Sequence, residues 1–131
     1  MLDTCSTRSD ELHIEKINGR AMRLHAMDAW VRDPAVLTDA AMLEAVLRRA
    51  ADAGGATVVG DEFCVFDNGA VTGVLVLAQS HLSIHTWPEF ALANVDLLSY
   101  GDLQGDVVLA SIAEALDVER SRVVCLHRAF D

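Results

Sequence analysis

The sequence predicts an α+β fold, a two-layer domain in which a largely antiparallel sheet carries two helices on one face. Three observations lead to this prediction. The 131-residue chain fits one domain that is large enough to bury a core unaided. A hydrophobic fraction of 52% and a mean hydropathy of +0.27 indicate a globular protein. The segments follow one another as strand, helix, several strands, helix and strand.

Two segments have apolar residues at helical spacing. The first can be capped by Thr38 or Asp39 and runs to about residue 53, where a pair of glycines ends it. The second runs over residues 105–116 and also carries its apolar residues on one side. We interpret these stripes as packing surfaces.

The remaining segments have the composition of strands. Asp33-Pro34 ends the first strand, and the turn residues Asp67-Asn68-Gly69 separate the second from the third. Residues 71–78 form a nearly unbroken run of β-branched residues and leucine, which predicts a central strand buried on both faces. The expected strands are residues 20–30, 56–66, 71–78, 79–89, 90–100 and 122–127.

Composition argues against several kinds of partner. A net charge of −10 does not suit a nucleic-acid surface, which needs a basic patch. No apolar run approaches the roughly 20 residues that span a bilayer, and the N-terminus lacks the apolar core of a secretory signal. We therefore expect a cytoplasmic protein with no membrane partner. The three cysteines include no CxxC pair, so no zinc site is indicated.

The domain boundaries and the assembly follow from the same patterns. Residues 1–18 are polar and charged without a sustained period, and we expect a loose leader ahead of one domain at residues 19–131. The helices would cover one face of the sheet, and strands this apolar make an open second face unfavourable. A homodimer with sheet packed against sheet satisfies this requirement.

Most of the candidate chemistry lies in residues 79–89, Gln-Ser-His-Leu-Ser-Ile-His-Thr-Trp-Pro-Glu. On a strand, His81, Ser83 and His85 share one face. One interpretation is structural, with these side chains hydrogen-bonded on a surface strand. A second is a metal site, but histidines four residues apart on a strand are about 13 Å apart, too far to share one ion without a bulge.

A third interpretation comes from a resemblance. Residues 80–89, Ser-His-Leu-Ser-Ile-His-Thr-Trp-Pro-Glu, resemble the signature of the bacterial and archaeal S-adenosylmethionine decarboxylase proenzymes. The resemblance extends from about residue 24 to 127 and includes Phe66, the stretch Val71-Thr72-Gly73 and the turn Tyr100-Gly101-Asp102. It implies a decarboxylase of S-adenosylmethionine that supplies the aminopropyl donor for spermidine biosynthesis.

The resemblance also implies self-cleavage between Gln79 and Ser80. The Ser80 hydroxyl would attack the Gln79 carbonyl to form an ester, and elimination and hydrolysis would leave a covalent pyruvoyl group on residue 80. Such a ketone forms a Schiff base with a substrate amine and accepts electrons as CO₂ departs, so no external cofactor is needed. The expected enzyme is a homodimer of cleaved protomers.

Further roles follow from matching positions in the family. His85 matches the processing base, and Thr72 stands where a processing serine is usual. Phe66 and Trp87 match aromatic residues that hold the adenine, and Glu89 matches a carboxylate that binds the ribose hydroxyls. In an ideal strand His85 would point away from the cleavage site, so we expect a bend or bulge near the cut.

Two positions depart from the family pattern. Gln79 replaces a glutamate, and Tyr100 replaces the catalytic cysteine that is the expected proton donor to the substrate's α-carbon. A phenol is bulkier than a thiol and a weaker acid, with a reference pKa near 10 against about 8.5. Tyr100 favours an alternative, a pyruvoyl-dependent decarboxylase of ornithine or arginine. Both departures together favour another, a non-cleaving regulatory homologue.

Overall fold

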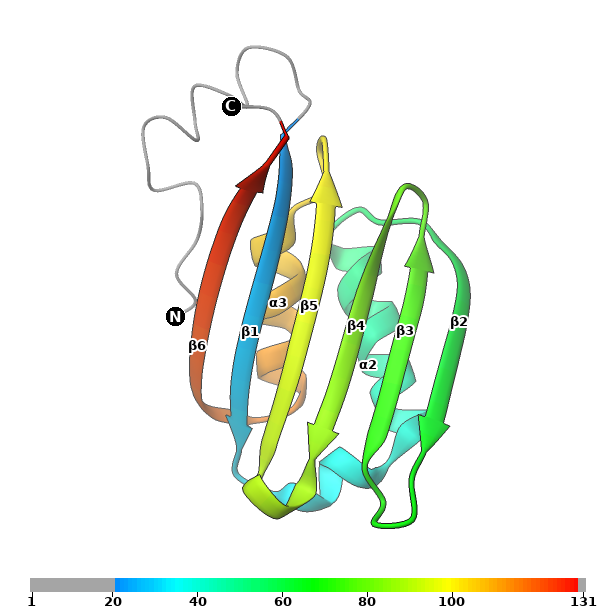
Figure 1. Cartoon of the computed structure of the whole chain (residues 1–131), viewed down its shortest axis with the longest axis vertical. Coiled ribbons are helices and arrows are strands. Elements are labelled where there is room, and N and C mark those ends of the chain that lie inside the picture. Colours follow the sequence, from blue (N-terminus) through cyan, green and yellow to red (C-terminus); the bar gives the residue numbers. More distant parts are fainter. Residues whose placement is uncertain (1–20, 130–131) are drawn as a thin grey trace.

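The structure is a computed structural model that describes residues 21–129. Within this range it contains a six-stranded sheet with two α-helices packed on one face (Figure 1). The strand order is β2-β3-β4-β5-β1-β6, and every neighbouring pair is antiparallel. This arrangement confirms the predicted α+β class. The leader expected at residues 1–18 lies outside the described residues.

The elements follow the predicted order along the chain. The strands are β1 (Met22–Val31), β2 (Val58–Val65), β3 (Val71–Leu77), β4 (Ser80–Trp87), β5 (Leu92–Tyr100) and β6 (Val118–Arg128). The helices are α2 (Ala40–Ala53) and α3 (Gly105–Ala115), with short 3-10 turns η2 (Pro34–Thr38) and η3 (Pro88–Phe90). β6 is longer than predicted because charged residues at its outer positions mask the strand pattern.

Aspartate caps explain the starts of two of the helical segments, α2 and η2. Asp39 caps α2 by accepting a hydrogen bond from the Met42 amide at 3.1 Å. Asp33 caps η2 in the same way through the Ala35 amide at 3.0 Å, and a proline follows it. The sequence analysis did not predict η2. In each case an aspartate directly before the helical segment accepts a hydrogen bond from a backbone amide in its first turn.

The core lies between the helices and the face of the sheet that they cover. It includes Leu43 and Leu47 from α2, Leu109 and Ile112 from α3, and Leu75, Leu82, Ile84 and Leu97 from the sheet. Gly73 belongs to this layer because a Cβ there would overlap the Phe63 ring. The central strands therefore pack tightly against one helical layer.

The opposite face of the sheet is uncovered in the single chain. Val76 on β3 is 48% exposed, although its neighbours Leu75 and Leu77 are buried. The prediction that β3 is buried on both faces is therefore wrong for one chain, because both helices lie on the same side. Val124 and Leu126 on β6 share this open face with 61% and 55% exposure. No helix among the described residues is long and apolar enough to cross a bilayer.

Candidate functional site

β4 carries the candidate segment through the middle of the sheet. It pairs with β3 on one side and with β5 on the other. Leu82 and Ile84 are fully buried on the helical face, whereas His81 and His85 are partly exposed on the open face. The predicted alternation is confirmed, and it directs both histidines away from the helices.

The bulge expected near the cleavage site is absent from β4. Its register with β3 and β5 runs without a shift, because hydrogen bonds on both sides hold the strand regular. Ser80 and His85 therefore begin and nearly end the same straight strand, about 16 Å apart. A single chain does not bring these two residues together.

One end of β4 gathers five of the predicted residues around a pocket. The pocket has a volume of about 310 Å³ and lies beside the β2–β3 turn and the end of β4. Its lining includes Phe66, Thr72, His85, Trp87 and Glu89. Phe66 and Trp87 are 53% and 43% exposed, which leaves large aromatic surfaces available to a ligand.

Thr72 and His85 occupy directly opposite positions on β3 and β4. Their side chains are joined by a hydrogen bond of 3.1 Å between Thr72 Oγ1 and His85 Nδ1. This bond fixes the orientation of the imidazole ring and leaves Nε2 on its far side. The resemblance implied a processing role for each of these two residues, but it did not predict that their side chains are bonded to each other.

Trp87 is held by a chain of side chains that the sequence analysis did not identify. Its indole Nε1 donates to Asn94 Oδ1 at 2.6 Å, and Asn94 Nδ2 donates to Asp28 Oδ1 at 2.8 Å. The two partners come from β5 and β1, so the chain crosses three adjacent strands. A signal was available, because Asn94 and Asp96 are polar residues alternating with apolar ones in β5.

The other end of β4 carries the predicted cleavage site. Ala78 and Gln79 form the two-residue turn between β3 and β4, and Ser80 is the first residue of the new strand. Gln79 has a φ of +73°, in the left-handed region that side chains disfavour by about 1–2 kcal/mol. A strained residue thus lies directly before the bond predicted to break.

Tyr100 lies near this turn, at the end of the neighbouring strand β5. Together with Gln79 and Asp102 it lines a pocket of about 420 Å³ that reaches the end of α2. The structure therefore places Tyr100 with the cleavage site and not with the Trp87 pocket. The predicted site residues fall into two groups, one at each end of β4.

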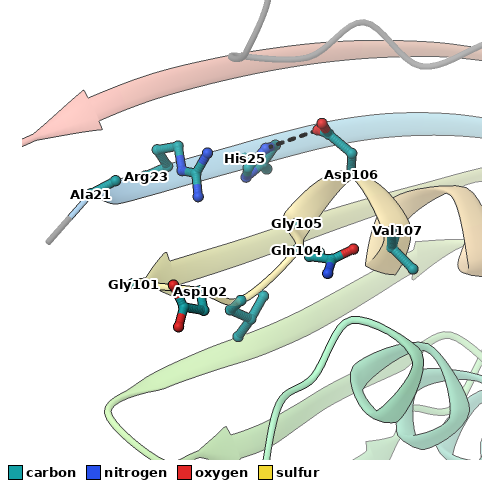
Figure 2. A pocket seen from close by; sticks show the side chains of 10 residues that line it. Ala21, Arg23, His25, Gly101, Asp102, Gln104, Gly105, Asp106 and Val107 are labelled. Atoms are coloured by element: carbon teal, nitrogen blue, oxygen red, sulfur yellow. Dashed lines mark ion pairs between the residues drawn. The ribbon is translucent and has the colours of Figure 1, made fainter. Parts of the chain in front are cut away.

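A third pocket lies on the helical side of the loop that follows Tyr100 (Figure 2). It has a volume of about 370 Å³ and includes Arg23 and His25 of β1 and the start of α3. His25 Nε2 lies 3.4 Å from Asp106 Oδ1, which ties β1 to the first turn of α3. Burial lowers the pKa of His25, while the nearby Asp106 carboxylate opposes that effect. His25 was not predicted as a site residue.

Metal-ligating side chains do not converge on either histidine of β4. Over residues 21–129, no three side chains from histidine, cysteine, aspartate and glutamate form a group that could hold an ion.

The sequence matches a known protein family. The sequence model of the S-adenosylmethionine decarboxylase family matches residues 23–129. An S-adenosylmethionine decarboxylase proenzyme from Thermodesulfovibrio yellowstonii is 34% identical over 103 residues, covering 73% of this chain and 76% of the relative. The proenzyme from Thermotoga petrophila is 38% identical over 93 residues, covering 70% of this chain and 72% of its own length.

The fold has a counterpart among solved structures. The crystal structure of the adenosylmethionine decarboxylase from Aquifex aeolicus is similar with a TM-score of 0.79 and 26% sequence identity. The match covers 86% of this chain and 93% of that protein.

Proposed function

This chain belongs to the S-adenosylmethionine decarboxylase family, and we propose that it cleaves itself before Ser80 and decarboxylates S-adenosylmethionine with the resulting pyruvoyl group. One observation carries the proposal. Phe66, Trp87 and Glu89, which match the nucleoside-binding residues of the family, line one pocket with Thr72 and His85. The substrate is a small molecule with an adenine that suits the two aromatic rings.

Self-cleavage uses groups that the chain itself supplies. The Ser80 Oγ attacks the Gln79 carbonyl carbon, the C–N bond breaks, and the acyl group moves from nitrogen to oxygen as an ester. Removal of the Ser80 α-proton then expels the Gln79 carboxylate and leaves dehydroalanine. Water hydrolyses the tautomeric imine, releases ammonia and leaves a ketone. The left-handed Gln79 supports this proposal, because breaking its peptide bond relieves strain.

The two ends of β4 meet if the enzyme is a homodimer. The open face of the sheet carries the exposed apolar residues Val76, Val124 and Leu126, which favour burial against a second copy. A two-fold axis that lies between two such sheets, perpendicular to β4, reverses the strand direction. It places the His85 end of one protomer over the partner subunit's Ser80.

Each group then has a distinct task in the shared site. Phe66 and Trp87 stack on the adenine, and Glu89 accepts hydrogen bonds from the ribose hydroxyls. His85, oriented by Thr72, removes the Ser80 α-proton of the other protomer during processing. Tyr100 Oη delivers a proton to the substrate α-carbon after CO₂ leaves. The pyruvoyl ketone supplies the electron sink for that loss.

A second substrate class rests on one observation. Tyr100 is bulkier than the cysteine of the family and lines a pocket beside the cleavage turn, so it would narrow the space for the methionine part of the substrate. This favours a smaller substrate such as ornithine or arginine. A small amino acid, however, has no use for the aromatic residues and the carboxylate of the Trp87 pocket.

Release of labelled CO₂ discriminates between these substrates. Cleaved protein is incubated with carboxyl-labelled S-adenosylmethionine, ornithine, arginine and lysine in parallel. We expect release from S-adenosylmethionine to be the fastest of the four. Faster release from an amino acid would replace the proposal with the second substrate class. Full-length mass after long incubation would instead indicate a non-cleaving homologue.

A further inference from the structure

The orientation of Trp87 depends on two residues outside the pocket that it lines. We propose that Asn94 and Asp28 are positioning residues that hold the Trp87 indole for the adenine, and thereby set the affinity for the nucleoside. This inference rests on the proposed function, because it takes Trp87 as a base-stacking residue. Neither Asn94 nor Asp28 lines the Trp87 pocket, so they act through the indole.

The chemistry of the three side chains allows only one arrangement of the hydrogen bonds. An indole N–H can only donate, and an ionised carboxylate can only accept. The Asn94 amide lies between them with its oxygen toward Trp87 and its nitrogen toward Asp28. Turning the amide over would set two donors against each other on one side and two acceptors on the other. Asp28 therefore selects the Asn94 orientation that Trp87 requires.

The register of the sheet explains why the chain can reach the indole. Asn94 lies directly opposite Asp28 on β1 and opposite His85 on β4, while Trp87 is one diagonal step further along β4. All three bonded side chains project from the open face. Backbone pairing fixes Asp28 and Asn94, so an otherwise exposed ring at the end of β4 is tied to the middle of the sheet.

Holding the Trp87 ring in one orientation lowers the entropic cost of ligand binding. A 43% exposed tryptophan at the end of a strand can occupy several rotamers, and a ligand that stacks on it must select one. A hydrogen bond to the edge of the ring makes that selection before the ligand arrives and leaves the ring faces free for stacking. Loss of the bond should weaken nucleoside binding about threefold to tenfold. It should raise KM with little change in kcat.

The first test observes the indole itself and needs no ligand. The chain has two tryptophans, so protein with ¹⁵N-labelled tryptophan gives two indole N–H signals, and Trp30 serves as the internal control. We expect Asn94→Ala to shift the Trp87 signal and speed its exchange with water, while the Trp30 signal keeps its position. Unchanged Trp87 signals in Asn94→Ala would overturn the proposal.

The second test is a double-variant cycle with 5′-methylthioadenosine, which carries the nucleoside and cannot lose CO₂. Calorimetric titration of cleaved protein should show the threefold to tenfold loss for Asn94→Ala. In a Trp87→Phe background, which keeps a ring and removes the N–H, the same change should alter Kd by no more than about twofold. An equal loss in both backgrounds would overturn the positioning role and leave the proposed function standing.

Exchanging the side chains of positions 28 and 94 distinguishes a positioning role of these residues from general damage to the fold. Asn94→Asp alone places two carboxylates side by side and should loosen Trp87. Combining it with Asp28→Asn restores both bonds, because the carboxylate at position 94 then accepts from the indole and from the amide at position 28. We expect the combined variant to recover the Trp87 signal and the affinity; no recovery would contradict the inference. A wild type that binds neither 5′-methylthioadenosine nor S-adenosylmethionine would overturn the proposed function itself, and this inference with it.

Discussion

The two ends of β4 differ in how much of a site one chain can build. At the Trp87 end, β3, β4, η3 and the turn before β3 bring aromatic, hydroxyl, imidazole and carboxylate groups around one pocket. At the Ser80 end, the chain supplies a strained turn and Tyr100, while His85 lies five residues away at the other end of β4. The groups at the Trp87 end suit the binding of a ligand, and the strained turn at the Ser80 end suits cleavage of the peptide bond that follows it.

Strand geometry explains this division. A regular strand advances about 3.3 Å per residue, so five residues separate Ser80 from His85 by more than any side chain can reach. Hydrogen bonds to β3 and β5 prevent β4 from folding back on itself. Catalysis that needs both ends therefore requires a second strand running in the opposite direction, which the proposed two-fold dimer would provide.

The largest effect expected at the Ser80 end is the loss of cleavage in Ser80→Ala. Without the hydroxyl there is no nucleophile for the Gln79 carbonyl, so intact mass should show a single chain even after long incubation. Ser83→Ala is the matched control, since it removes the same hydroxyl from the same strand three residues beyond the cleavage site. A cleaved Ser80→Ala protein would remove residue 80 from the chemistry.

The next effect concerns the proton that Tyr100 supplies. Tyr100→Phe keeps the ring and removes the hydroxyl, and we expect decarboxylation to fall by about a hundredfold or more. Tyr100→Cys supplies a stronger acid in a smaller side chain and should raise the rate roughly tenfold. Labelled CO₂ release from S-adenosylmethionine measures both. Wild-type turnover in Tyr100→Phe would show that this phenol is not the donor.

The smallest effect concerns strain at Gln79. Glycine adopts a φ of +73° freely, so Gln79→Gly should remove about 1 kcal/mol of strain and slow self-cleavage about fivefold. Ala78→Gly is the control, because Ala78 is not in the left-handed region. The fraction cleaved against time, read from denaturing gels, gives both rates. Equal rates for Gln79→Gly and wild type would mean that the strain does not assist the reaction.

Much of this architecture was predictable because its signals are local. Periodicity located both helices, turn residues at 67–69 located the β2–β3 hairpin, and alternation along β4 put His81, Ser83 and His85 on one face. The ten-residue signature then named His85, Trp87 and Glu89 of the Trp87 pocket, and the wider resemblance named Phe66 and Thr72.

Other features depend on information that a single segment does not carry. The distance from Ser80 to His85 follows from the pairing of β4 with both neighbours, which excluded the bulge that the sequence suggested. The partners of Trp87 come from β5 and β1, and Asp28 is 66 residues from Asn94 in the chain. The nearly unbroken apolar run of residues 71–78 gave no sign that Val76 would be exposed in a single chain.

Complementation between inactive chains tests the division of the site most directly. Ser80→Ala and His85→Ala chains, carrying different tags, are co-expressed and their heterodimer is isolated. In this heterodimer the His85→Ala chain keeps its Ser80 and faces an intact His85 from its partner.

We predict that the His85→Ala chain of the heterodimer is cleaved with wild-type speed. The Ser80→Ala chain stays intact, so one of the two chains in each heterodimer is cleaved. In its own homodimer the His85→Ala chain should process slowly and accumulate an ester that hydroxylamine cleaves. Intact mass of the two tagged chains distinguishes them. If the His85→Ala chain is cleaved no faster in the heterodimer than in its homodimer, the two ends of β4 do not meet across a dimer, and the shared-site account is wrong.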